Sequence, residues 1–400
     1  MGAAIWLIDS AAEYAVEGVN QVMWRKLEPR ADWHIALAIT TVLRVVYTGV
    51  AAAAAVFLHP DARSIHSNVL TGNLPAPGGW HYALLGIWQR FDTLWYLRIA
   101  EHGYDLPAGV VFYPLYPWLI RSLSGLTGPL AAALLISTVA AFFYFWGLLR
   151  LVENHVHSEF PNAQPLRTVM LAAVWPASFF FFAGYTEALA VALIVWCIGW
   201  ARDERWALAA ACAFAAGLTR SVGTLVIVPL AIMAWRAPRR VRWPIVIAPL
   251  GTLGYWFWLQ QTGRISAAAA YRTYWDTEVA SPWTTLWLAI RSLVERFDSL
   301  VMISLVALIF FFVAGVAARR RMRIEDRCFS AAVIVHLLLR SCWPPLLGAP
   351  RYLLPVYPAY LTMGKWAEEM QRTRFVFLCA TLFAFNLIWM LAFLNWSLVL

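Results

Sequence analysis

The chain has 400 residues, a formal net charge of +9, 62% hydrophobic but only 13% charged residues, and a mean hydropathy of +0.64. Soluble domains average about 45–50% apolar and about 25% charged residues, so this composition excludes an ordinary soluble protein and predicts an all-α multi-pass membrane protein. No soluble module carries the basic face that a nucleic-acid partner needs. Arginine supplies nearly all the basic residues beside Ala-rich runs, which suggests a GC-rich prokaryotic gene.

Residues 1–33 are predicted to be a cytoplasmic N-terminal segment. Apolar residues at helical spacing between Ile5 and Val22 indicate a short interfacial helix. Three acidic residues and the lack of a cleavage signature argue against a signal peptide. Residues 34–400 are predicted to form the transmembrane domain.

Eleven apolar runs have a length suited to membrane spans, which need about 20 residues and somewhat fewer inside a bundle. Several of these runs hold Gly or Pro, so some spans are expected to be broken or re-entrant. The runs lie near 34–58, 130–149, 168–182, 188–201, 206–217, 224–235, 243–260, 300–318, 328–340, 352–364 and 375–396. Two hydrophilic segments stand apart from them, residues 59–129 and 261–299.

The distribution of Lys and Arg predicts the orientation of these spans. With a cytoplasmic N-terminus, the inner segments carry 19 Lys and Arg residues and the outer segments carry 10. "RAPRRVR" at 236–242 and "ARRRMRIEDR" at 318–327 dominate the difference. Segments 59–129 and 261–299 are therefore expected outside the membrane.

The stretch "QRFDTLWYLRIAEHGYD" at 89–105 places an acid among aromatic residues in the first outer segment. Its pattern predicts a helix over 90–103 that ends at Gly103. Asp92 shares a face with Trp95, Tyr96 and Ile99, which would hold its carboxylate at the outer interface. An interfacial helix with an ordinary capping or ion-paired Asp explains the pattern equally well.

Two prolines follow in "VFYPLYPWLIRSL" at 111–123. Pro114 and Pro117 predict an extended entry before the next apolar residues. Tyr113 and Tyr116 offer flat rings on which a sugar could stack. A structural turn and a binding cleft are both open readings of this segment.

Three further polar groups stand at predicted outer ends of spans, in "FFFFAGYTEALAVA", "GLTRSVG" and "GAPRYLLPVYP". Ionisable residues at such depth are costly and usually have partners. Glu187 and an arginine could form a structural pair, whereas Arg220 and Arg351 carry guanidinium forks that suit phosphate oxygens. Arg44 and Arg340 also fall within spans, and the sequence assigns them no role.

Metal ligands are not indicated by spacing, because the histidines and the five cysteines form no ligand motif. No cofactor is predicted. A Mg²⁺ or Mn²⁺ ion held between Asp92 and a donor phosphate is an open alternative.

Five blocks, in order, carry a resemblance: "RFDTLWYLRIAEHGY", "VFYPLYPWLIR", "FFFAGYTEALAV", "LTRSVG" and "PRYLLPVYP". Together they resemble the signature segments of the GPI mannosyltransferase 2 family (PIG-V-like) within the GT-C superfamily, over about residues 88–360. The resemblance implies a GT-C-like bundle of about 11 transmembrane helices with interfacial helices in the first outer loop. It also implies a polyprenyl-phosphate-linked sugar donor and inverting transfer on the extracytoplasmic face.

The resemblance places the family's catalytic acid at Asp92. Two positions depart from the family pattern, Phe91 where a Trp is usual and Ser221 where a Pro is usual, and neither removes a catalytic group. The resulting candidate site has Asp92 as base, Arg220 and Arg351 as phosphate ligands, and as substrate-binding residues Trp95, Tyr96, His102, Tyr113, Tyr185, Glu187 and Tyr352.

The expected function is therefore transfer of a hexose, with mannose favoured, to a glycan, glycolipid or protein acceptor at a prokaryotic plasma membrane. The competing class is a transporter or flippase of lipid-linked saccharides, which would also need aromatic clefts and phosphate-binding arginines. A carrier would not need a carboxylate on an outer surface helix, and no internal repeat typical of carriers is evident. A noncatalytic scaffold would explain the topology but not the five polar blocks.

Overall fold

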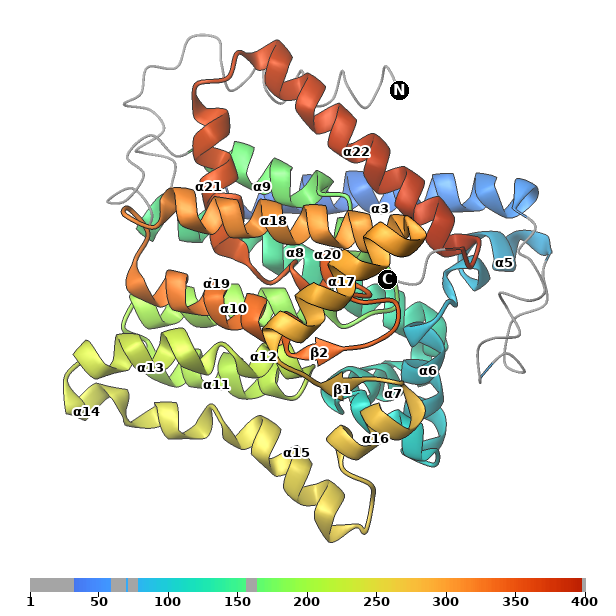
Figure 1. Ribbon diagram of the computed structural model, residues 1–400, viewed down its shortest axis with the longest axis horizontal. Coiled ribbons are helices and arrows are strands. Elements are labelled where there is room, and N and C mark those ends of the chain that lie inside the picture. The colour runs from blue at the N-terminus through green and yellow to red at the C-terminus, as the bar shows by residue number, and fades with distance from the viewer. Residues whose placement is uncertain (1–31, 59–69, 71–77, 156–163, 398–400) are drawn as a thin grey trace.

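The computed structural model describes residues 32–58, 70, 78–155 and 164–397, and these are mostly helical (Figure 1). The interfacial helix predicted between Ile5 and Val22 lies outside the described residues, which include only the last two positions of the N-terminal segment 1–33.

Four helices are long and apolar enough to cross a membrane. They are α3 (Asp32–Phe57), α8 (Pro129–His155), α18 (Ser299–Ala318) and α22 (Arg372–Leu394). Shorter helices fill the other predicted spans: α9 (Pro165–Val174), α10 (Glu187–Arg202), α11 (Trp206–Gly217), α12 (Ser221–Thr224), α13 (Ile227–Arg236), α15 (Leu250–Gln261), α19 (Ile324–Leu338) and α21 (Tyr357–Glu368). With its composition, this architecture makes the chain a multi-pass integral membrane protein.

Breaks in the predicted spans occur where proline interrupts an apolar run. Trp175, the residue before Pro176, has φ −55° and ψ 141°, so α9 ends there and the short helix η4 (Ser178–Phe181) follows. The run 243–260 is likewise divided into η5 (Trp243–Ile247) and α15, with Pro249 at the N-cap of α15. The expectation of broken spans is confirmed at these two places.

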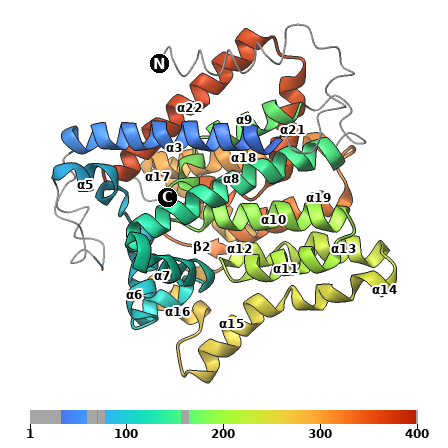
Figure 2. The same ribbon diagram turned by 180° about the vertical axis from the view of Figure 1, so that it is seen from behind.

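The core is a stack of helices in which small side chains allow close approach. α10 packs against α8 and α11, α3 packs against α8, and α13 packs against α19. Figure 2 shows α3, α8, α10 and α11 as successive layers. Gly147 on α8 makes such an approach: a Cβ there would lie 2.9 Å from Nε1 of Trp196.

The described part of the first hydrophilic segment, residues 70 and 78–129, consists mainly of short helices. These are α5 (Gly79–Leu84), η2 (Gly86–Trp88), α6 (Asp92–His102), η3 (Pro107–Val111) and α7 (Leu115–Thr127). The helix predicted over 90–103 is confirmed as α6, and Gly103 caps its C-terminus with φ 73°, a left-handed conformation that glycine adopts without strain.

The extended entry predicted at Pro114 and Pro117 is wrong. Pro114 has helical angles, φ −78° and ψ −24°, and forms the N-cap of α7, while Pro117 lies in the first turn. A proline is tolerated there because the first amide groups of a helix have no acceptor within it. The two prolines therefore start a helix instead of delaying it.

The second hydrophilic segment contributes α16 (Ala267–Tyr274), β1 (Glu278–Val279) and α17 (Pro282–Arg296). β1 pairs antiparallel with β2 (Arg340–Ser341), so the fold is not purely helical as predicted. Nε1 of Trp275 donates to the carbonyl of Ala108 at 3.0 Å, and its ring lies 5.4 Å from that of Trp95. The two hydrophilic segments thus pack together, with β1, α6, α7 and α16 neighbouring one another in Figure 1.

Arg90 joins the first hydrophilic segment to the end of α22. Its side chain donates to the carbonyl of Leu394 at 2.8 Å and to the hydroxyl of Tyr82 at 2.9 Å. The guanidinium also lies 5.1 Å from the ring centre of Trp396, and the residue is only 2% exposed. Since Phe91 and Asp92 follow directly, this contact holds the start of α6 in place.

We expect Arg90→Ala to destabilise the protein by about 2–4 kcal/mol, because it leaves buried acceptors without a charged donor. The measurement is the unfolding midpoint of the full chain in detergent. Arg98→Ala is the matched control, since Arg98 pairs with Asp105 at 2.5 Å in a partly exposed position where such pairs contribute about 0–1 kcal/mol. Equal midpoints for the two variants would contradict the anchoring role.

Candidate active site

Asp92 stands at the first turn of α6, after a strained residue. Phe91 has φ 45°, a left-handed conformation that is unfavourable for an aromatic residue. The backbone amide of Asp92 donates to the hydroxyl of Tyr185 at 3.2 Å, and the Asp92 side chain is 24% exposed. The carboxylate is therefore held in position while remaining accessible.

Arg351 is the ion-pair partner of Asp92. It lies on the short helix α20 (Ala349–Tyr352), its Nη1 is 2.6 Å from Oδ2 of Asp92, and its Nε is 3.4 Å from Oε1 of Glu187. The Arg351 side chain is 7% exposed. Within the described residues Oδ1 of Asp92 has no hydrogen-bond partner, so one carboxylate oxygen is held and the other is open.

Glu187 and Arg220 form a second ion pair beside the first. Glu187 begins α10 with a side chain that is 2% exposed, and its Oε1 is contacted by Nη1 of Arg220. Arg220 lies in extended backbone between α11 and α12. A Cβ at Gly223 would collide with the carbonyl of Ala216, so glycine permits the tight turn that presents Arg220 to Glu187.

Tyr352 lies at the centre of three guanidinium groups. The distances from its ring centre to the Cζ atoms of Arg340, Arg220 and Arg351 are 4.3, 5.0 and 5.1 Å. Arg340 was given no role from the sequence, because it stood at the end of an apolar run with nothing to show its neighbours.

Tyr185 and Tyr96 form hydrogen bonds at the residues that carry or adjoin the two carboxylates. Tyr185 is buried, and Tyr96 shares a hydrogen bond of 3.1 Å with the hydroxyl of Thr186, next to Glu187. Burial raises the pKa of the Tyr96 phenol well above its ordinary value, so this phenol stays neutral. Both rings contribute hydroxyl groups and shape to the site without adding charge.

Among the described residues, three other predicted substrate-binding residues form no hydrogen bond, ion pair or cation–π contact with these charged groups. Trp95 stacks on Phe112 at 5.6 Å, and Tyr113 packs against Tyr255 at 5.0 Å, so both are buried among aromatic rings. His102 is exposed at the far end of α6, about 15 Å along the helix from Asp92 at 1.5 Å per residue. Direct contacts join six of the predicted site residues, Asp92, Glu187, Arg220, Arg351, Tyr185 and Tyr352, and Tyr96 is hydrogen-bonded to the residue before Glu187. Within the described ranges, Trp95, Tyr113 and His102 make no such contact with the charged groups.

A metal could be held only by the carboxylates of Asp92 and Glu187 at this position. Among the residues that the structure describes, no group of three or more His, Cys, Asp or Glu side chains lies close enough to hold a metal ion. Both carboxylates face guanidinium groups, and a Mg²⁺ or Mn²⁺ ion would have to share them with these cations.

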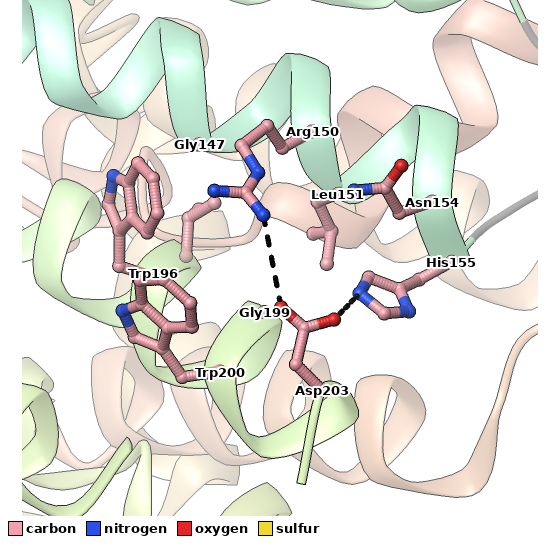
Figure 3. Close-up of a pocket in the computed structure, with 10 residues that line it drawn as sticks. Gly147, Arg150, Leu151, Asn154, His155, Trp196, Gly199, Trp200 and Asp203 are labelled. Carbon is pink, nitrogen blue, oxygen red and sulfur yellow. Dashed lines mark ion pairs between the residues drawn. The ribbon is translucent and has the colours of Figure 1, made fainter. Parts of the chain in front are cut away.

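A separate polar pocket lies near the C-terminal end of α10. Asp203 there accepts from Nε2 of His155 at 3.0 Å and lies 4.0 Å from Nη2 of Arg150, beside Trp196 and Trp200 (Figure 3). Because α10 has 16 residues, this pocket is about 24 Å from Glu187 along the helix. It contains none of the predicted site residues.

Comparison with known proteins gives a partial match to one family. Residues 78–234 match the family model described as Mannosyltransferase (PIG-V). GPI alpha-1,6-mannosyltransferase 2 of Mus musculus is 34% identical over 149 residues, and that of Homo sapiens is 32% identical over 145 residues. In both, the matched part is 34% of this chain and 29% of the relative, so the chain spans less than a third of the curated relatives it matches.

Among solved structures, ArnT from Cupriavidus metallidurans bound to undecaprenyl phosphate has a TM-score of 0.46 at 14% identity. That comparison covers 87% of this chain and 62% of that chain. The family match includes Asp92, Glu187 and Arg220 but ends before Arg351. Arg351 nevertheless completes the ion pair with Asp92.

Gly184 lies close to α6, so a substitution at this glycine tests how closely the position of Asp92 is fixed. A Cβ at Gly184 would lie 2.7 Å from Cγ2 of Thr93, the residue after Asp92. We expect Gly184→Ala to push α6 away and to lower activity by about tenfold or more, since small misplacements at a reacting centre are costly.

The measurement is the initial rate of the hexose transfer expected from the sequence, in full-length protein. Gly199→Ala on α10 is the control, because a Cβ there meets no atom within 4 Å. Equal activity in the two glycine variants would contradict close positioning by Gly184.

Proposed function

We propose that this protein is a membrane-embedded glycosyltransferase of the PIG-V type with a GT-C-like bundle. It transfers a hexose, mannose by the partial family match, from a polyprenyl-phosphate-linked donor to an acceptor hydroxyl, with inversion. The observation that carries the proposal is the accessible Asp92 carboxylate, held through one oxygen by Arg351 beside a second carboxylate–guanidinium pair.

Asp92 acts as the general base in this proposal. The acceptor hydroxyl must lose its proton as it attacks the anomeric carbon, and a positioned base contributes roughly 10²–10⁴-fold to such a step. The open Oδ1 accepts that proton, while Arg351 fixes the orientation of the carboxylate through Oδ2. Because the leaving group is already a phosphate, no general acid is required.

Arg220 and Arg351 stabilise the departing phosphate. Their guanidinium groups are held in place before the reaction, and preorganised charges of this kind act where negative charge develops. Glu187 orients both cations, since its Oε1 faces Arg220 and Arg351. Substrate contacts of Trp95, Tyr113 and His102 stay predictions.

An extracytoplasmic active site agrees with the placement of charge along the helices. Glu187 begins α10 and Arg220 precedes α13, whereas the basic segment 236–242 follows the far end of α13. In Figure 1, α14 (Arg239–Arg242), within this basic segment, lies on the opposite side of the molecule from β1 and α6. Under the positive-inside rule, this distribution of charge supports the proposal that the site faces the extracytoplasmic side.

Asp92→Asn is expected to reduce transfer by about 10²-fold or more, because the amide keeps the shape but cannot take the proton. The assay uses purified full-length protein, a polyprenyl-phosphate mannose donor and a panel of glycan and glycolipid acceptors, with slow donor hydrolysis as a second readout. Asp105→Asn is the control, since Asp105 only pairs with the partly exposed Arg98. Near wild-type transfer by Asp92→Asn would overturn the assignment.

Arg220→Lys keeps the positive charge and loses the planar fork. We expect the KM for the donor to rise by about tenfold while the protein stays folded, because a lysine cannot contact two oxygens in the same way. An unchanged donor KM would count against the phosphate role. In the same assay, lipid-linked sugar that moves across vesicles without bond cleavage would favour the transporter alternative.

A further inference from the structure

Arg340 lies beside the two ion pairs but does not belong to either. Its backbone is held by the β-ladder, in which Arg340 pairs with Val279. Its guanidinium Cζ lies 4.3 Å from the ring centre of Tyr352 and 5.7 Å from that of Tyr271. Within the described part of the chain, no carboxylate forms an ion pair with Arg340.

The charges around Tyr352 therefore do not cancel. Three guanidinium groups, of Arg220, Arg340 and Arg351, lie around the Tyr352 ring, whereas only two carboxylates, of Asp92 and Glu187, pair with members of this group. We refer to these five residues as the arginine cluster. With both acids ionised its net charge is +1, and an uncompensated buried charge costs several kcal/mol. Such a cluster is suited to a ligand that brings negative charge.

We propose that Arg340 is a third phosphate ligand of the lipid donor, and that the net charge of the arginine cluster follows the charge of the phosphate during the reaction. This inference rests on the proposed glycosyl transfer and goes beyond it by assigning a residue and a charge balance.

The charge balance follows from the bonds that change. The donor is a phosphodiester with one negative charge, which equals the +1 of the cluster. In the transfer the acceptor O–H bond breaks and its proton moves to Asp92, a bond forms between the acceptor oxygen and the anomeric carbon, and the bond from that carbon to the phosphate oxygen breaks. The electron pair stays on that oxygen, giving a phosphate monoester with two negative charges. Neutral Asp92 leaves the cluster at +2, so both states are balanced.

Tyr352 adds a neutral donor to the same position. Nη2 of Arg351 donates to its hydroxyl oxygen at 3.3 Å, so the phenol proton remains available for a phosphate oxygen. The guanidinium of Arg340 lies over the same ring, 4.3 Å from its centre, and a lysine ammonium lacks the planar group that packs on an aromatic face.

The test is binding of farnesyl phosphate, a short polyprenyl phosphate monoester, to the full chain in detergent, with farnesol as the uncharged comparison. Arg340→Gln should weaken farnesyl phosphate binding by about tenfold or more and leave farnesol binding unchanged, since a charge-assisted contact is lost. Asp92→Asn should tighten farnesyl phosphate binding by about threefold or more, because it leaves the cluster at +2 and releases Arg351.

The opposite directions separate this charge balance from a structural role, which would weaken binding in both variants. Arg272→Gln is the matched control, because Arg272 is an exposed arginine of α16 that faces Glu278. If Arg340→Gln does not fold, Arg340→Lys replaces it, with an expected loss of about threefold. Unchanged binding in the folded Arg340 variant, or weaker binding in Asp92→Asn, overturns the proposal.

Competition with inorganic phosphate distinguishes a site for the phosphate group itself from a site that requires the lipid chain. Displacement of farnesyl phosphate by millimolar phosphate in wild type, but not in the Arg340 variant, supports a site for the phosphate group itself. Displacement that is equal in both proteins contradicts a role for Arg340. Because no sugar takes part, the binding result is independent of glycosyl transfer. Phosphate binding without sugar transfer would overturn the proposed function alone. Sugar transfer by the wild type together with unaltered binding in Arg340→Gln would overturn this inference alone.

Discussion

The pairing of two carboxylates with two guanidinium groups constrains the rest of the site. A single charge removed from water costs several kcal/mol, so a buried acid requires a partner at close range. Asp92 and Arg351 are 259 positions apart in sequence, yet they are joined by a contact of 2.6 Å. This pair fixes the first hydrophilic segment against α20, while Glu187 and Arg220 fix the start of α10 against the α11–α12 turn. Four distant parts of the chain thus converge for an electrostatic reason.

Features that depend on neighbouring residues could be predicted from the sequence. The long helices α3, α8, α18 and α22 follow from uninterrupted apolar runs, since only length and composition are needed. The helix α6 followed from spacing and from the glycine after it. Proline was harder to interpret, because the same residue ends a helix in its interior and starts one in its first turn, as Pro114 shows.

For features that depend on tertiary contacts, the sequence could only narrow the set of candidate residues. Asp92, Glu187, Arg220 and Arg351 were selected because ionisable groups in apolar surroundings need partners, but the sequence did not show which acid meets which base. An aromatic residue gives no comparable signal: Trp95 and Tyr352 look alike as flat rings, yet one packs among aromatic side chains and the other among three arginines. Arg340 was passed over because its position depends on pairing between β1 and β2.

The different exposure of the charged groups suggests where the acceptor and the lipid phosphate would bind in the proposed reaction. Asp92 is the more exposed of the two acids, whereas Glu187 is buried and faces both Arg220 and Arg351. In the proposed reaction the acceptor would approach the open oxygen of Asp92, and the lipid phosphate would lie deeper, against the guanidinium groups around Tyr352. A sugar between them would then have the attacking oxygen and the departing phosphate on opposite faces. In-line displacement with that arrangement inverts the anomeric centre, so the stereochemistry would follow from a sugar held between the open oxygen of Asp92 and the guanidinium groups that bind the phosphate.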